Sequence, residues 1–359
     1  ADDLKLQDWL NNYIFPREAH LDDRAVKAAT LLGIAECLRF GVTSVSDMYD
    51  HCDAICQAVA ESGIKANISR GMTMFLGDEF DFEKFPACQE LVALRDKWQG
   101  YDNGRIRITY GPHAPYTCPV DYLEKVIAEA AANKAEIQMH LCETKFEVDT
   151  VVKEHGMTPI QLMDKLGMFE LGTITAHCVH LTDEDMDIMA AKHVRVAHNP
   201  QSNLKLASGI APVAAMLNKG ICVGLGTDGA SSNNNLDMLE ECRAAAMLHK
   251  ATTFDPLVVP AKKAWEMATV DGAKTLGFAD TGLLEAGQQA DIVLWDMHKP
   301  YWYPRHNKLS QLVYAASSTD ADTVFVAGKK VVEAGKLLTF DEEKIYAEAE
   351  ACTRKLLNK

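Results

Sequence analysis

The sequence has no long apolar run and no basic stretch. Its 359 residues contain no uninterrupted apolar segment of the roughly 18 residues that a membrane span requires. The 36 basic residues are outnumbered by 51 acidic ones, giving a formal net charge of −15, and no stripe of Lys and Arg could neutralise phosphates. The first residues, Ala-Asp-Asp-Leu-Lys, do not resemble a secretory signal. These absences disfavour membranes and nucleic acids as partners and predict a cytoplasmic protein.

The ten cysteines contain no CxxC pair. The two nearest, Cys52 and Cys56, lie in a segment with helical periodicity. A chain of this length can bury a sufficient core without disulfides, so the pattern predicts reduced thiols packed as small apolar side chains.

No glycine-rich phosphate loop follows any predicted strand, which disfavours a nucleotide-binding doubly wound sheet. Up to Gly277, short β-branched runs alternate with segments of helical periodicity. The predicted strands cover 42–47, 66–70, 106–110, 137–141, 173–177, 194–198 and 221–225. This alternation predicts an α/β fold with a parallel sheet, and reactive residues at the strand ends favour a (β/α)8 TIM-like barrel. The sequence shows seven strand–helix units where such a barrel needs eight, so one unit is missing.

After Gly277 the pattern changes to short strands joined by glycine-containing turns, followed by a charged helix over 341–357. We therefore predict two domains. Residues 1–277 form the barrel, and residues 278–359 form a small β unit that needs further partner strands, plus the terminal helix.

Reactive side chains end the later predicted strands. His140, His177 and His198 each close a strand, and Asp228 follows the last one in GLGTDG. Such ends meet at one mouth of a barrel, and imidazole with carboxylate is a ligand set of zinc or non-haem iron. The set predicts a metal site, although any one of these histidines alone could be structural. His180 is expected to lie beside the site or to be structural.

Two more residues have a candidate role. Glu143, just beyond His140, could shuttle protons near an activated water, the alternative being a solvated glutamate that caps a helix. His113 lies between two prolines in GPHAPY, a rigid setting that suits a substrate contact, with structural packing as the alternative. His51 is expected to be a surface-loop residue.

Five motifs in order resemble one known family. They read GPHAPYTC, QMHLCET, TAHCVHL, AHNPQSNLKLASGIAP and GLGTDGASSNNNLDM. They are similar to motifs of the metal-dependent amidohydrolases and, more narrowly, of the 5-methylthioadenosine/S-adenosylhomocysteine deaminases. The resemblance covers nearly the whole chain and implies a (β/α)8 barrel, whose first strand is missing here. A small β-sandwich built from both chain ends is implied as well, with its C-terminal part in residues 278–359. It also implies hydrolytic deamination of an adenine nucleoside (5-methylthioadenosine, S-adenosylhomocysteine, 5′-deoxyadenosine or adenosine) to the inosine analogue and ammonia.

The resemblance assigns catalytic roles residue by residue. His140 would bind one divalent metal ion, zinc first and iron second. Asp228 would be a metal ligand, the general base and a substrate contact. Glu143 would carry a proton to the purine ring and contact the substrate, and His177 would orient the attacking water.

The resemblance also assigns substrate contacts. Glu18, in FPREA, would accept both ribose hydroxyls, and Trp9 would lie along the thioether. Arg70, in SRGM, would meet the carboxylate of a homocysteinyl substrate. His113 and Ser232 would contact the substrate too.

The sequence departs from the family pattern in two places. The stretch FLGDEFDFEKF after Arg70 is acidic and lacks the second arginine of some relatives, which predicts poor use of S-adenosylhomocysteine. The chain also has no His-x-His, which in the family ends the first strand and supplies two metal ligands. With the missing strand and the start at Ala1, this predicts an N-terminal segment upstream of Ala1 that carries two further histidine ligands.

The same residues are compatible with other functions. The same site could hydrolyse another amino- or chloro-substituted heterocycle, such as a triazine, guanine or a pterin. The chain could instead be a metal-free inactive barrel that serves as a binding subunit, or a fragment completed by a partner chain. We expect a small-molecule nucleoside partner and a homo-oligomer.

Overall fold

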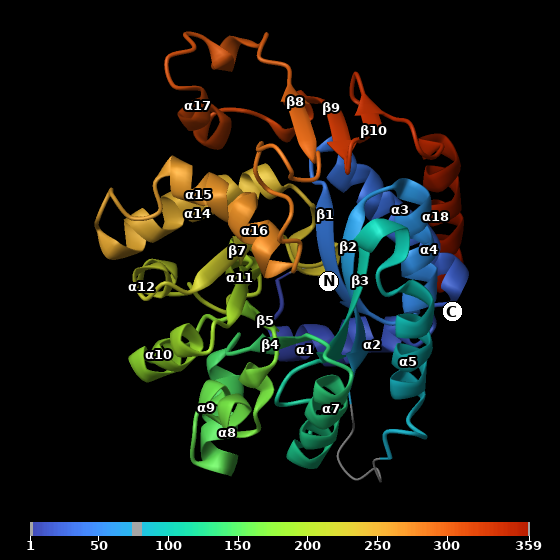
Figure 1. The fold of residues 1–359 in the computed structure, drawn as a ribbon, viewed down its shortest axis with the longest axis vertical. Helices are drawn as coiled ribbons and strands as arrows, with labels where there is room; N and C mark the ends of the chain where they lie inside the picture. The colour runs from blue at the N-terminus through green and yellow to red at the C-terminus, as the bar shows by residue number, and fades with distance from the viewer. Residues whose placement is uncertain (1–2, 74–80, 358–359) are drawn as a thin grey trace.

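A computed structural model describes residues 3–73 and 81–357 (Figure 1). Part of the acidic stretch that follows Arg70, residues 75–80, lies outside the described residues. Seven strands form one parallel sheet in sequential order. They are β1 (Ser44–Tyr49), β2 (Lys65–Met72), β3 (Ile106–Pro112), β4 (Ile137–Leu141), β5 (Thr173–His177), β6 (Arg195–His198) and β7 (Cys222–Leu225). Each coincides with or overlaps one predicted strand, so the α/β prediction is confirmed.

Helices lie around the outside of this curled sheet, as in part of a barrel (Figure 1). Those between strands are α4 (Cys52–Ser62), α5 (Pro86–Trp98), α6 (Tyr101–Gly104), α7 (Val120–Ala132), α8 (Lys145–His155), α9 (Pro159–Lys165), α10 (Asp183–Ala191), α11 (Pro200–Lys205) and α12 (Val213–Asn218). The described part begins with α1 (Leu6–Trp9), a short π-helix over Leu10–Ile14, α2 (Phe15–Glu18) and α3 (Asp23–Arg39). After β7 come α13 (Ala230–Asn233), α14 (Met238–Thr253), α15 (Ala261–Ala268), α16 (Val270–Thr275), α17 (Lys308–Tyr314) and α18 (Glu342–Leu357).

Local sequence explains where several helices begin. Asp22 caps α3 by accepting from the amide of Ala25 at 2.9 Å, and Thr144 caps α8 in the same way. Thr158 forms a capping box with Gln161 at the start of α9. Helices α15 and α16 are two separate helices, because the backbone at Thr269 between them is not helical.

The strands of the parallel sheet and the helices around them bury a continuous apolar core. Ile68 on β2, Ile108 on β3 and Val196 on β6 are almost fully buried in it. The ten cysteines are free thiols, and all but Cys222 and Cys352 are buried, as their pattern predicts.

A second, antiparallel sheet has the order β11-β10-β9-β8. Its strands are β8 (Ile292–Trp295), β9 (Ala321–Val326), β10 (Lys329–Glu333) and β11 (Lys336–Leu337), all from the C-terminal part of the chain. Helix α3 packs against this sheet and against α18 (Figure 1). A buried ion pair joins the two sheets, since Nζ of Lys65 on β2 lies 2.6 Å from Oδ2 of Asp291. The domain boundary at residue 277 stays a prediction. Among the described residues, no helix is long and apolar enough to span a membrane.

Candidate active site

Three histidines lie next to one another at the ends of β3, β4 and β5. The ring centroids of His113 and His140 are 4.8 Å apart, and those of His140 and His177 are 5.5 Å apart. Each ring is fixed at Nδ1, which lies 2.9 Å from Oγ1 of Thr117 for His113, 3.0 Å from the carbonyl oxygen of His113 for His140, and 2.8 Å from Oδ1 of Asn203 for His177. When Nδ1 donates, Nε2 carries the lone pair, which is the arrangement of a metal ligand or of a proton acceptor.

The electrostatics divide these three rings. Burial and the neighbouring histidines lower the pKa of His113 to about 3, and burial together with His177 lowers the pKa of His140. Burial also opposes the charged form of His177, but the carboxylates of Glu143 and Asp228 outweigh it and raise its pKa. His113 and His140 are therefore neutral at physiological pH, while His177 is the ring whose cation the site stabilises.

Asp228 follows β7 and is held by several donors. Its Oδ2 accepts from Oγ of Ser202 at 2.6 Å and from Oγ of Ser232 at 2.8 Å, and its Oδ1 accepts from the amide of Gly229 at 2.8 Å. Burial would raise the pKa of Asp228, but His177 and these hydrogen bonds lower it. The residue is an ionised carboxylate that faces the histidines. Ser232 is therefore placed as a partner of Asp228, and its predicted substrate contact stays a prediction.

Glu143 is buried, with 3% of its surface exposed, so the solvated helix-capping alternative is wrong. Its Oε1 accepts from Oγ of Ser208 at 3.2 Å, and its Oε2 lies 3.8 Å from Nε2 of His177. The backbone before it is fixed by Glu147, which accepts from the amides of Cys142 at 2.7 Å and Glu143 at 3.0 Å. The carboxyl group is thus fixed beside the histidine cluster.

The backbone at these strand ends has an uncommon conformation. Cys142, His177, Cys178 and Asp228 all have positive φ, between 51° and 71°. Non-glycine residues adopt this region rarely and at some cost, and such residues cluster at functional sites. The conformation directs the chain sharply away from the sheet after each strand.

The two residues expected at the ribose and thioether lie on the N-terminal helices. Glu18 accepts from the hydroxyl of Tyr49, at the end of β1, across 2.7 Å, and burial raises its pKa. Trp9 is buried in a small cluster with Leu6, Leu10 and Leu206. Leu206 follows the same segment that supplies Ser202 and Asn203, so this packing anchors the N-terminal helices next to the site. The predicted contacts of Glu18 and Trp9 with substrate stay predictions.

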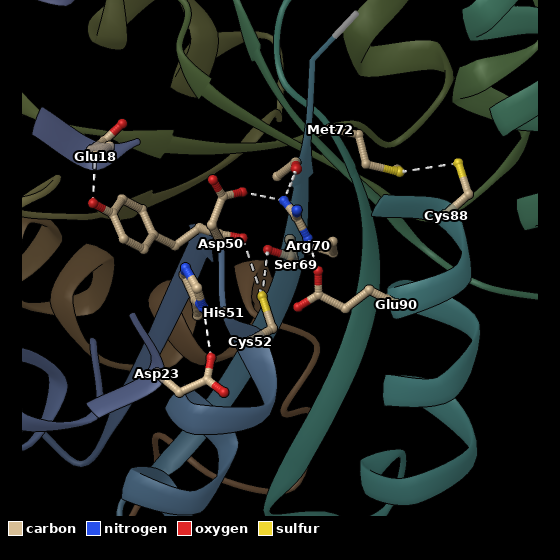
Figure 2. Close-up of polar contacts among 12 residues, drawn as sticks. Glu18, Asp23, Asp50, His51, Cys52, Ser69, Arg70, Met72, Cys88 and Glu90 are labelled. Carbon is tan, nitrogen blue, oxygen red and sulfur yellow. Dashed lines mark hydrogen bonds and ion pairs between the residues drawn. The ribbon is translucent and has the colours of Figure 1, made fainter. Parts of the chain in front are cut away.

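Arg70 lies near the end of β2, between two carboxylates (Figure 2). Its Nε donates to Oε2 of Glu90 at 2.6 Å, and its Nη1 pairs with Oδ1 of Asp50. Its predicted contact with a substrate carboxylate stays a prediction.

Other histidines lie apart from the cluster. Nε2 of His198 is 3.1 Å from Nε2 of His249 on α14, which agrees with the structural alternative for this histidine. The side chain is buried against a helix although the residue ends a strand. His180 contacts the carbonyl oxygen of Ser208 through Nε2 at 2.7 Å, which agrees with a supporting role beside Glu143. His51 precedes α4 and pairs with Asp23 at 2.6 Å.

Sequence reasoning did not identify the residues that hold the site in place. They are Tyr49, Thr117, Glu147, Ser202, Asn203 and Ser208. Ser202 and Asn203 belong to the recognisable motif AHNPQSNLKLASGIAP, so the motif was a usable signal. Nothing in the sequence marks Glu147 or Tyr49, since each acts through a backbone or side-chain contact that only the fold creates.

The donor chemistry of His140 and Asp228 suits a divalent metal, because Nε2 of the first and the carboxylate of the second remain available to a cation. These two donors are too few for a complete metal site. Within residues 3–73 and 81–357, no group of three or more His, Cys, Asp or Glu side chains is arranged to hold a metal ion. The described residues thus bring together His140 and Asp228, and their role as metal ligands stays a prediction.

Comparison with known proteins defines the class of this protein. Residues 1–331 match the amidohydrolase family, whose members are metal-dependent hydrolases. The chain is 50% identical, over 359 residues, to a 5-methylthioadenosine/S-adenosylhomocysteine deaminase of Dictyoglomus thermophilum, covering 100% of this chain and 83% of that protein. The chain therefore belongs to the amidohydrolase family, among the 5-methylthioadenosine/S-adenosylhomocysteine deaminases.

Solved structures agree with the fold. A zinc-bound adenosine deaminase from Xanthomonas campestris superposes with a TM-score of 0.93 at 34% identity, covering 100% of this chain and 82% of that one. A zinc-bound atrazine chlorohydrolase from Arthrobacter aurescens superposes with a TM-score of 0.89 at 25% identity, covering 98% and 83% respectively. The prediction of a barrel enzyme of this superfamily is confirmed.

Proposed function

We propose that this protein hydrolytically deaminates 5′-substituted adenine nucleosides, releasing the inosine analogue and ammonia. The observation that carries the proposal is the placement of Glu143, His177 and Asp228 in one buried cluster beside His140. The 50% identity to the 5-methylthioadenosine/S-adenosylhomocysteine deaminase of Dictyoglomus thermophilum supports the same reaction.

The residues divide the proton transfers between them. Asp228, kept ionised by its hydrogen bonds, accepts the proton of the attacking water. Glu143, when protonated, donates to the purine ring nitrogen and makes the adjacent amino-bearing carbon more electrophilic. His177, fixed by Asn203 and facing Glu143, orients the water and stabilises the charge that develops as it adds. Asp228 then returns its proton to the amino group, the C–N bond breaks and ammonia leaves, while the hydroxyl proton passes to Glu143 as the carbonyl forms, so that both carboxyl groups are restored.

The metal belongs to the proposal as well. His140 and Asp228 would be ligands from this chain, zinc being the first choice because two zinc-bound structures resemble the fold. When bound, a divalent cation supplies Lewis-acid activation of water. The proton transfers themselves are made by side chains of this protein.

The contacts with the substrate are part of the same proposal. Glu18 would bind the ribose hydroxyls, Trp9 would cover the 5′-substituent, and His113 and Ser232 would contact the base. The pairing of Glu18 with Tyr49 supports this, since one carboxylate oxygen is anchored and the other can accept from a ligand.

A variant of Glu18 separates the nucleoside assignment from its main alternative, hydrolysis of a free heterocycle. Glu18→Ala should raise KM for 5′-methylthioadenosine far more than for adenine, guanine or a triazine. Tyr13→Phe, an exposed site on the same N-terminal segment, is the matched control. Equal changes for nucleosides and free bases would contradict the nucleoside assignment.

We also propose a homo-oligomer and a cytoplasmic location. The family resemblance supports the first and the ten free cysteines support the second. Light scattering on the purified protein tests the first, and fractionation of the cells that make it tests the second.

A further inference from the structure

The guanidinium of Arg70 is already occupied within the protein. Its Nε donates to Glu90 on α5, and its Nη1 pairs with Asp50 and with the carbonyl oxygen of its neighbour Gly71 (Figure 2). A planar carboxylate binds arginine best through two parallel N–H groups, which are either Nε with Nη2 or Nη1 with Nη2. Each of those pairs includes a nitrogen that is engaged here. An incoming carboxylate would therefore have to displace Glu90 or Asp50.

The fixed charges around Arg70 oppose an anion. One guanidinium faces two carboxylates, so the three side chains carry a net negative charge. Arg70 is shielded, with 14% of its side chain exposed, while Asp50 and Glu90 are 57% and 35% exposed. A ligand that approaches from solvent thus meets the two acids more readily than the guanidinium.

Arg70 and its two carboxylate partners lie beside Glu18, the residue proposed to bind the ribose. Tyr49 and Arg70 are register partners on β1 and β2, and Tyr49 donates to Glu18 through its hydroxyl. Asp50 follows Tyr49 directly and contributes to the raised pKa of Glu18, so the two acids act on each other electrostatically. The 5′-substituent of a nucleoside whose ribose lies on Glu18 would extend toward this negative group.

We infer that Asp50 and Glu90 are specificity-determining residues, which hold Arg70 away from the substrate and select adenine nucleosides whose 5′-substituent lacks a carboxylate. The inference rests on the proposed function, because it concerns the 5′ end of the same substrate. It assigns a neutral substituent such as methylthio, or a cationic one, as preferred over the homocysteinyl group.

Three nucleosides isolate the carboxylate as the cause. They are 5′-methylthioadenosine, S-adenosylhomocysteine and the decarboxylated form of the latter, which keeps the ammonium group. The metal-loaded native protein is expected to show kcat/KM for the first and third at least about tenfold above that for the second.

Removing the two negative charges should reverse this preference. In D50N/E90Q the ratio of kcat/KM for S-adenosylhomocysteine to that for 5′-methylthioadenosine should rise about tenfold or more, since Arg70 is released to bind the carboxylate. Adding R70M to this variant should abolish the gain. The control D23N/E61Q changes the net charge equally, but its acids pair with His51 and Lys27 and leave Arg70 held, so the ratio should not change.

The outcomes separate the inference from the proposed function. Equal rises in D50N/E90Q and in D23N/E61Q, or a wild-type protein that uses all three nucleosides alike, would overturn the inference and leave the deaminase intact. If D50N/E90Q unfolds at assay temperature, the single variant E90Q and the wild-type preference decide. Failure of the wild-type protein to turn over or to bind any of the three, measured by calorimetry, would contradict both.

Discussion

His177 and Asn203 are joined by a hydrogen bond of 2.8 Å between Nδ1 and Oδ1, from the end of β5 to helix α11. An amide oxygen only accepts, so Nδ1 carries the proton and Nε2 faces Glu143 with its lone pair or, in the cation, with its second proton. One amide side chain therefore sets both the tautomer and the orientation of the ring.

Replacing that amide should impair catalysis more than binding. Asn203→Ala is expected to lower kcat about tenfold or more, because outer-shell partners of catalytic histidines have effects of that size, while KM changes little. Asn133→Ala, whose amide bonds to Glu129 at the end of α7, is the control and should leave kcat unchanged. A variant at 203 with normal kcat and a raised KM would show that the hydrogen bond serves substrate binding instead.

Glu241 should make stability fall with pH. Burial raises its pKa from 4.5 to about 8, although the amide of Gln201 and Nδ2 of Asn233 both donate to it. Between these two pKa values the folded state keeps the proton that the unfolded state releases. The unfolded state then binds fewer protons, so the free energy of unfolding is largest below about pH 4.5 and decreases as pH rises toward 8.

The variant Glu241→Gln cannot ionise and should flatten this dependence. Urea denaturation at several pH values between 5 and 8 measures it, with the exposed Glu124→Gln on α7 as the matched control. A slope that is the same in Glu241→Gln as in the wild type would show that Glu241 is not the group responsible.

The ion pair of Lys65 and Asp291 should stabilise the attachment of the second sheet to the barrel. Their side chains are 1% and 5% exposed, and Asp291 also accepts from Oγ1 of Thr281 and the amide of Ala327. Lys65→Met leaves Asp291 buried and unpaired, which is expected to cost about 3–5 kcal/mol in the free energy of unfolding. The exposed pair of Lys330 and Glu333 is the control, for which Lys330→Met should cost about 0–1 kcal/mol. Equal losses in both variants would contradict the role assigned to the buried pair.

Much of the fold could be predicted from the sequence because its signals are local. Each of the seven parallel strands was marked by a β-branched run, and the residues at their ends, His140, His177 and Asp228, lie together because parallel strands end at the same edge. His198 shows the limit of that reasoning. It also ends a strand, but successive side chains alternate between faces, and its ring packs on His249 of α14.

The remaining features depend on contacts between distant parts of the chain. Glu90 reaches Arg70 from a helix, and Asn203 reaches His177 from another strand–helix unit. A sequence motif identifies the arginine or the histidine, but it does not show which side chain forms a hydrogen bond or an ion pair with it. The division between α15 and α16 is also hidden in the sequence. Apolar residues continue at helical spacing across Thr269, while the backbone conformation of Thr269 is not helical.

The most direct test is to follow 5′-methylthioadenosine in the presence of the native, zinc-loaded protein and to measure ammonia and the nucleoside product together. The proposed function predicts that ammonia and 5′-methylthioinosine form in equal amounts, that a chelator stops the reaction and that Zn²⁺ restores it. Unchanged 5′-methylthioadenosine after incubation with the folded, metal-loaded protein would contradict it.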